Sequence, residues 1–287
     1  MNVKNILLVY KKSAYSIYFE HPRSSFKRHA GLPAEISRFE TTHRNHFECL
    51  RTVENVLKRC AVRYTKVCRG HKVDYRRFDL IITVGGDGTF LEAARSVKTQ
   101  AMLGVNSDPS WSVGRFCCAD IQSYEKIFKN FLLGKIVVKK FPRIELQVRD
   151  KKVCVLNDIL VCHHNPAAMS RYYLSVNGIK EEQKSSGIWI STAVGSSGGI
   201  KSAGGRQLAA VSDKMQYRPR ELYRGREKSG YKLRGGIVSS ATKISVTSLM
   251  REGFVFVDGS HVFFPFDFGE TIHATGSSNP LKVVWLR

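Results

Sequence analysis

Several features are missing from this sequence, and each absence excludes a class of protein. No hydrophobic run is long enough to cross a membrane, because the apolar stretch at 6–10 is far too short. The seven cysteines are odd in number and include no CxxC pair, which argues against a disulfide framework. No signal peptide is recognisable, so we expect a cytoplasmic protein with no membrane partner. His163 and His164 are neighbours in an extended segment and point to opposite faces, so we predict no metal site there.

Acidic residues are scarce relative to basic ones. The chain has 24 aspartates and glutamates against 46 lysines and arginines, a net charge of +22. Such an excess attracts polyanions, which include nucleic acid, anionic membrane surfaces and small nucleotides or polyphosphate. The densest basic cluster, within residues 218–234, is either a solvated loop or a segment that attracts phosphate. No nucleic-acid-binding module is recognisable, so we do not expect a nucleic-acid partner.

The first part of the chain alternates strands with helices. This rhythm is typical of an α/β domain with a Rossmann-like parallel sheet covered on both faces. Thr41 or Thr42 is expected to cap the start of the first long helix. The expected strands lie at 6–10, 61–67, 80–84 and 101–106, and the expected helices at 42–60, 89–97 and from Asp120 to Gly134.

After Gly134 the pattern changes to short alternating strands separated by turn residues. Asn177-Gly178 is the strongest short signal of a hairpin in this region. The second part is therefore predicted to be an all-β, sandwich-like domain. At 287 residues the chain is long enough for two domains. We expect an α/β domain over 1–136 and a β-rich domain over 137–287, whose last segment can pack back on the first domain.

The stretch "VGGDGTF" places Asp87 between Gly86 and Gly88, directly after a buried strand. A dinucleotide fingerprint is incomplete here because its third glycine position is Leu91, and no P-loop occurs anywhere in the chain. Phosphoryl transfer remains open: the glycines let backbone approach phosphates, and Asp87 could accept a hydroxyl proton or help to hold a magnesium ion. A plain turn with no chemistry is equally open from this motif alone.

Two further stretches favour a ligand site. Asn157 and Asp158 interrupt an apolar strand, where an amide and a carboxylate need partners. Ribose hydroxyls or a base would serve, as would a structural hydrogen-bond pair. Residues 185–205 form a glycine- and serine-rich loop after another strand. Small side chains there would let a flat ligand lie against the backbone.

Taken together and in order, these stretches resemble the NAD kinase family, which phosphorylates the 2′-hydroxyl of the adenosine ribose of NAD to give NADP. The resemblance is greatest to the plant-type, NADH-preferring branch, and it implies an α/β domain followed by a β-rich domain. The matching motifs are "GGDGT" at 85–89, "GVN" at 104–106, "LND" at 156–158, "STAVGSSGGIKSAGG" at 191–205 and "VDG" at 257–259.

The resemblance also implies roles for particular residues and for ligands. Asp87 would be the catalytic proton acceptor, while Gly86 and Gly88 would shape the phosphate loop. The substrate would be NAD or NADH, the phosphoryl donor ATP or polyphosphate with Mg²⁺, and the protein a homo-oligomer, either dimer or tetramer. The remaining substrate-binding residues that the resemblance implies are Asn106, Asn157, Asp158, Ser196, Ser197, Gly198 and Ser202.

Two departures from the common family pattern bear on substrate preference. Ser186 stands where many members have an acidic residue, and Ser197-Gly198-Gly199 replaces a common Thr-Ala-Tyr. Both departures resemble the NADH-preferring branch and favour NADH. A lipid kinase of the diacylglycerol or sphingosine type, which shares "GGDG", is an alternative enzyme. A non-catalytic polyanion-binding protein is the alternative from another class, motivated by the net charge.

Overall fold

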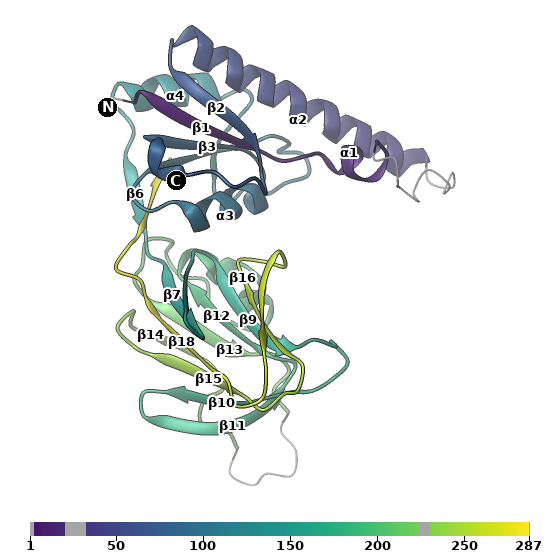
Figure 1. Ribbon diagram of the computed structural model, residues 1–287, viewed down its shortest axis with the longest axis vertical. Helices are drawn as coiled ribbons and strands as arrows, with labels where there is room; N and C mark the ends of the chain where they lie inside the picture. The colour runs from purple at the N-terminus through teal and green to yellow at the C-terminus, as the bar shows by residue number, and fades with distance from the viewer. Residues whose placement is uncertain (1–2, 21–32, 224–229, 287) are drawn as a thin grey trace. The chain divides into compact units, whose positions relative to one another are not determined.

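The first part of the chain forms the parallel sheet that its alternating strands and helices predict. Figure 1 shows the computed structural model, which describes residues 3–20, 33–223 and 230–286. The chain divides into two compact units, one of residues 1–139 with 282–287 and one of residues 140–281. In the described ranges, no helix is both long and apolar enough to cross a membrane.

The sheet of the first unit has seven strands in the order β2-β1-β3-β4-β19-β6, with β5 paired to β4. Neighbours from β2 to β4 run parallel, as do β4 with β5 and β4 with β19. Every residue of β3 is buried, as expected for a central strand with both faces covered. The strands are β1 (Asn5–Tyr10), β2 (Arg63–Cys68), β3 (Leu80–Gly85), β4 (Ala101–Asn106), β5 (Cys117–Asp120), β6 (Val138–Phe141) and β19 (Leu281–Val284).

Helices cover this sheet, and the longest differs from the prediction. α2 begins at Pro33, not near Thr42, and the Thr41 hydroxyl donates to the Ser37 carbonyl inside the helix instead of capping its start. Leu50, Val53 and Leu57 of α2 lie in the core, as their spacing predicts. The other helical elements are α1 (Ala14–Tyr18), a 3-10 turn η2 (Tyr75–Arg77), α3 (Asp87–Ser96) and α4 (Tyr124–Leu132).

The second unit consists of two six-stranded sheets, which confirms the predicted all-β architecture. Their orders are β11-β10-β15-β18-β7-β8 and β14-β13-β12-β9-β16-β17, with antiparallel pairs. Apolar residues from both sheets share one core, for example Tyr172 and Leu174 from one and Ile159 and Val255 from the other. Alternation of buried residues with more accessible ones along β10 and β16 reflects this two-layer packing.

The strands of the first of these sheets are β7 (Ile144–Val148), β8 (Lys151–Val155), β10 (Ser170–Val176), β11 (Ile179–Ser185), β15 (Ile244–Ser248) and β18 (Thr271–Gly276). Those of the second are β9 (Asp158–His163), β12 (Ile188–Thr192), β13 (Met215–Pro219), β14 (Gly236–Val238), β16 (Gly253–Val257) and β17 (Val262–Phe266). The hairpin predicted at Asn177-Gly178 joins β10 to β11, and both residues have positive φ, 50° and 80°. A two-residue turn of this kind matches the twist of the strands that it connects.

Candidate active site

The glycine loop of the first unit connects β3 to α3. Gly86 is the N-cap of α3, and Asp87 is its first residue. A Cβ on Gly86 would lie 2.5 Å from the Ser112 hydroxyl, so a side chain here would require Ser112 to turn away. Gly88 is exposed, and the nearest atom to a Cβ there would be Nη1 of Arg69 at 3.7 Å. Gly86 therefore lies in close contact with Ser112, whereas Gly88 leaves an open approach to the start of a helix.

Asp87 is half-buried and held from one side. Its Oδ1 accepts a hydrogen bond from the Phe116 backbone N–H at 2.8 Å. Phe116 is itself fixed, because its ring stacks on buried Phe90 with centroids 5.3 Å apart. Among the residues that the structure describes, Oδ2 of Asp87 accepts no hydrogen bond. The carboxylate is thus oriented, with one oxygen left for a ligand.

Asn106 supports the same loop through its neighbour strand. It ends β4 directly beside Gly85 of β3 and is 6% exposed. Its Nδ2 donates to the Ser112 carbonyl at 2.8 Å, and its Oδ1 accepts from the Asp108 N–H at 3.2 Å. Both ends of the side chain are therefore used to shape the segment that places Ser112 against Gly86.

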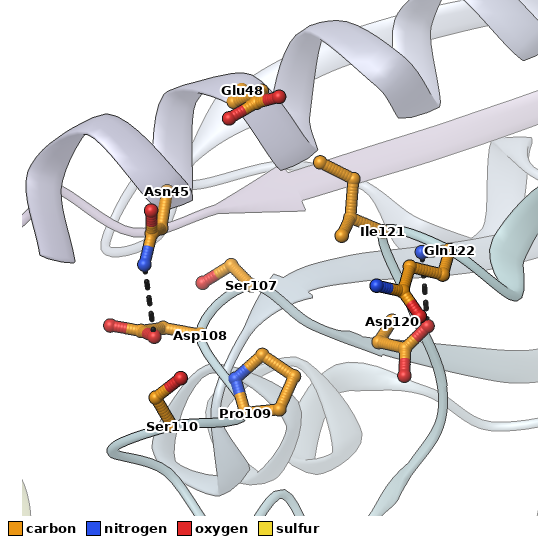
Figure 2. Close-up of a pocket in the computed structure, with 9 residues that line it drawn as sticks. All are labelled: Asn45, Glu48, Ser107, Asp108, Pro109, Ser110, Asp120, Ile121 and Gln122. Carbon is orange, nitrogen blue, oxygen red and sulfur yellow. Dashed lines mark hydrogen bonds between the residues drawn. The ribbon is translucent and has the colours of Figure 1, made fainter. Parts of the chain in front are cut away.

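A hollow of about 380 Å³ lies where α2 faces the ends of β4 and β5 (Figure 2). Asn45 and Glu48 of α2 line it together with Asp108 and Asp120. Asp108 is 3% exposed and accepts a hydrogen bond from Asn45 at 3.3 Å. Three carboxylates line this hollow, and their charge would repel a phosphate. It does not suit the phosphoryl donor.

A buried polar cluster in the second unit contains Asn157 and Asp158. Asp158, the first residue of β9, is 5% exposed, and its Oδ2 accepts from Asn157 Nδ2 at 2.8 Å. The Asp258 carboxylate accepts the backbone N–H groups of Leu156, Asn157 and Asp158 at 3.2, 2.6 and 3.3 Å. Burial, and then the nearby charge of Asp258, raise the pKa of Asp158 to about 7. Asp158 therefore gains or loses its proton near neutral pH.

The small-residue loop after β12 packs onto this cluster. The Thr192 hydroxyl donates to the Leu156 carbonyl at 2.6 Å and accepts from the Gly195 N–H at 3.0 Å. A Cβ on Gly195 would overlap the Asn157 carbonyl, and one on Gly198 would lie 3.4 Å from Oδ2 of Asp158. The loop, which continues through η3 (Val194–Ser197) and α5 (Gly199–Ser202), is therefore closely fitted to Asn157 and Asp158.

The predicted serines of this loop differ in their surroundings. Ser196 is fully buried, donates to the Ala193 carbonyl at 2.6 Å and accepts from the Leu208 N–H at 2.8 Å. Ser197 is half-buried beside Gly198, and Ser202 is exposed at the end of α5. Ser196 thus stabilises the loop itself, while Ser197 and Ser202 present their side chains nearer to solvent.

The predicted site residues accordingly fall into two groups. The structure brings Gly86, Asp87, Gly88 and Asn106 together in the first unit. In the second unit it brings Asn157 and Asp158 together with the loop of Ser196, Ser197 and Gly198, while Ser202 lies further along that loop, at the end of α5. Sequence reasoning gave no role to Asp258, although "VDG" was among the matched motifs, and none to Gly195 within its run of small residues. Neither residue's partner could be read from the sequence.

The basic segment 218–234 is partly structural. Residues 224–229 lie outside the described residues. Arg218 donates from Nε to the Ala203 carbonyl at 3.0 Å and from Nη1 to the Arg234 carbonyl at 2.9 Å. One of the arginines in this segment therefore connects the end of the small-residue loop to the segment before β14.

Comparison with known proteins shows which family the chain resembles. Residues 11–130 match the family model of the ATP-NAD kinase N-terminal domain. The chain is 30% identical over 277 residues to a protein of Oryza sativa subsp. japonica named "Probable NADH kinase", covering 88% of this chain and 85% of the relative. It is 27% identical to the NADH kinase of Arabidopsis thaliana, covering 88% and 87%.

A solved structure extends the comparison to the fold. The crystal structure of an NAD kinase from Archaeoglobus fulgidus in complex with ATP superposes with a TM-score of 0.72 at 24% identity, covering 98% of this chain and 93% of that one. This likeness concerns the fold alone. The assignment to a family rests on the similarity to the Oryza sativa protein. By its sequence similarity over most of both chains, this protein belongs to the NAD kinase family.

Proposed function

We propose that this protein transfers a phosphoryl group to the 2′-hydroxyl of the adenosine ribose of NAD or NADH, giving NADP or NADPH. The observation that carries the proposal is the setting of Asp87. One carboxylate oxygen is held by the Phe116 N–H, the other accepts no hydrogen bond from the described residues, and exposed Gly88 follows directly. Asp87 accepts the proton of the attacking hydroxyl, while Gly86 and Gly88 let the phosphates approach the start of α3.

A divalent cation fits this site as a companion of the phosphates. In the described part of the chain, no group of three or more histidines, cysteines or acidic residues could hold a metal ion. Mg²⁺, however, is commonly bound by one or two carboxylates together with substrate phosphates. Because Asp87 acts as the proton acceptor, the ion would be held mainly by the donor phosphates and water, and it would neutralise charge on the transferring phosphoryl group.

The dinucleotide is assigned to the polar cluster of the second unit. Asn157 and Asp158 hold the adenosine portion and its ribose hydroxyls. Ser197, Gly198 and Ser202 line the dinucleotide, and buried Ser196 holds their loop in place through its own hydrogen bonds. Support comes from Gly198, since the space over it adjoins Oδ2 of Asp158, and from the fixed backbone at 156–158.

NADH is the preferred acceptor and ATP the preferred phosphoryl donor in this proposal, with polyphosphate as a second donor. The plant relatives are named NADH kinases, and the archaeal NAD kinase was crystallised with ATP. The cytoplasmic location is proposed because the seven cysteines show no pattern of structural disulfides, and the homo-oligomeric state is proposed from the family resemblance.

The test is a matrix of assays with purified protein and Mg²⁺. NAD or NADH is combined with ATP or polyphosphate, and NADP(H) is measured with a dehydrogenase specific for it. We expect product in at least the well that holds NADH and ATP. Labelled ATP with a lipid extract should give no labelled lipid. Absence of NADP(H) from every well, together with salt-sensitive retention of nucleic acid in a gel shift, would favour the polyanion-binding alternative.

A further inference from the structure

Three adjacent strands of the first sheet end beside the glycine loop. Tyr10, the last residue of β1, pairs with Cys68 of β2 on one side and Val84 of β3 on the other. The Arg69 N–H donates to the Tyr10 carbonyl at 2.7 Å. Lys11 and Arg69 therefore leave the sheet at the same edge as the loop that contains Gly88. Ligands of open parallel sheets bind at this carboxyl edge.

Arg69 is oriented toward the glycine loop. Its Nε lies 3.5 Å from Oε2 of Glu92, whose Oε1 accepts the Gly70 N–H at 2.6 Å. Nη1 lies 3.7 Å from the position that a Cβ on Gly88 would occupy. The side chain is 29% exposed, so it is partly shielded from water and still accessible. Glu92 thus fixes one side of the guanidinium while Nη1 lies beside the start of α3.

Lys11 adds a second positive charge at this edge. It is half-buried, and its carbonyl is hydrogen-bonded by Nε2 of His46 at 2.8 Å. Burial, and then the charge of Arg69, hold the pKa of Lys11 below its ordinary value, while Asp108 opposes them. Burial also lowers the pKa of His46 to about 4, so this ring is neutral at physiological pH. An anion bound near Lys11 and Arg69 would relieve their mutual repulsion.

Two hollows flank Arg69, with volumes of about 340 and 330 Å³. Both are lined by Cys68, Arg69, Gly70 and His71. Lys12 lines the first in addition, and Lys72 and Arg95 line the second, where Glu92 is the single acidic residue. These hollows are basic, in contrast to the acid-lined hollow beside α2.

We propose that Lys11 and Arg69 form the site for the terminal phosphates of the phosphoryl donor, a nucleoside triphosphate or an inorganic polyphosphate. The proposal rests on the function proposed above and adds residues outside the glycine motif. During transfer, the bond from the terminal phosphorus to its bridging oxygen breaks and a bond to the ribose 2′-oxygen forms. The hydroxyl proton moves to Asp87, and the negative charge left on the departing chain is stabilised by Arg69 and Lys11. Arginine suits this role because its planar fork matches phosphate oxygens.

The test measures phosphate binding separately from turnover. Inorganic tripolyphosphate is titrated calorimetrically into the full chain and into Arg69→Gln, Lys11→Gln and Arg69→Lys. The control is Arg59→Gln, which removes the same charge from an exposed arginine of the same unit that pairs with Glu125. We expect Kd to rise at least about tenfold in the two Gln variants, less in Arg69→Lys, and less than twofold in the control.

Steady-state kinetics complete the test. The KM for ATP should rise in Arg69→Gln and Lys11→Gln while the KM for NADH stays within about twofold. Parallel runs with ATP and with polyphosphate distinguish the source of the phosphates. Unchanged tripolyphosphate binding in both Gln variants, or an equal loss in Arg59→Gln, would overturn the site. If tripolyphosphate binding depends on Arg69 but no dinucleotide is phosphorylated, the anion site stands and the proposed function fails. Thermal melts identify any variant that does not fold. If one of the two Gln variants does not fold, tripolyphosphate binding by the other one tests the site.

Discussion

The glycine loop of the first unit and the polar cluster of the second differ in how many hydrogen bonds the protein makes to their acidic residues. Asp87 accepts one backbone hydrogen bond and lies next to exposed Gly88, whereas Asp258 accepts three and Gly195 is packed against backbone. The first region is left open for charged groups that a ligand brings. The second is prebuilt, meaning that its hydrogen bonds are already made within the protein, and this suits its proposed role because base and ribose recognition needs hydrogen-bonding groups at fixed positions.

The largest expected effect compares two glycine substitutions. In Gly195→Ala the new methyl group would overlap the Asn157 carbonyl, and backbone cannot turn away as a side chain can. We expect a loss of about 3 kcal/mol in unfolding free energy. In Gly88→Ala the nearest atom is Arg69 Nη1 at 3.7 Å, an ordinary contact, and alanine favours the helix. Its stability should change by less than about 1 kcal/mol.

Chemical denaturation of both variants measures this difference in stability. Activity assays measure the effect of Gly88→Ala on catalysis. Gly88→Ala should fold normally and still lose activity, because its methyl group would occupy the approach to the start of α3. Equal destabilisation by the two substitutions would contradict the distinction between an open and a prebuilt region.

Asp258→Ala tests the prebuilt region through its hydrogen bonds. The substitution leaves the N–H groups of Leu156, Asn157 and Asp158 without their shared acceptor. We expect a loss of about 2–3 kcal/mol in unfolding free energy and weaker NADH binding, with tripolyphosphate binding unchanged. Denaturation together with the two titrations checks this. Weakened tripolyphosphate binding with intact NADH binding would reverse the assignment of the two regions.

Titration of Asp158 is expected to change the unfolding free energy with pH, by less than the substitutions above. The pKa of Asp158 is about 7 in the folded chain against an ordinary value of 3.8, so the folded state holds more protons between these values. Unfolding free energy therefore falls as pH rises through this window. From pH 5 to pH 8 the loss from this group is about 2 kcal/mol, and Asp158→Asn should remove it. Denaturation of both proteins at the two pH values measures the difference.

His46 in the first unit makes the unfolding free energy depend on pH in the opposite direction. Its pKa is lowered from 6.5 to about 4, so the unfolded chain holds more protons between these values. Its contribution to stability is lost as pH falls through that range. The Asp158→Asn substitution should leave this acid-side loss unchanged. If the variant flattened the acid side instead, the raised pKa of Asp158 would be wrong.

The local signals of the sequence predicted much of the fold. Apolar stretches located β1 to β4 of the parallel sheet, helical spacing located α2, α3 and α4, and Asn177-Gly178 located a hairpin. The start of α2 was missed because Phe39 in its first turns packs on Tyr18 and Phe19 of the α1 segment, a contact that local spacing does not indicate. β5 and β6 were missed as well, since four residues are too few for a periodic pattern.

Within the candidate site, the sequence predicted motif residues but not their partners. Asp87 and Asn157-Asp158 stand out because a carboxylate among glycines or inside an apolar strand is unusual. Asp258 contacts residues about one hundred positions earlier, and Arg69 reaches Gly88 only because β2 and β3 both border β1. Such contacts follow from sheet order, which local patterns do not specify.

The most direct test of the central claim is the rate of NADPH formation by Asp87→Asn at saturating NADH and ATP. The asparagine oxygen can still accept the Phe116 N–H, so the loop and the melting temperature should be retained. Loss of the proton acceptor should lower kcat at least about 100-fold, with both KM values within a few-fold of the parent. A folded variant whose kcat stays within about tenfold of the parent would contradict the assignment of Asp87 as the catalytic carboxylate.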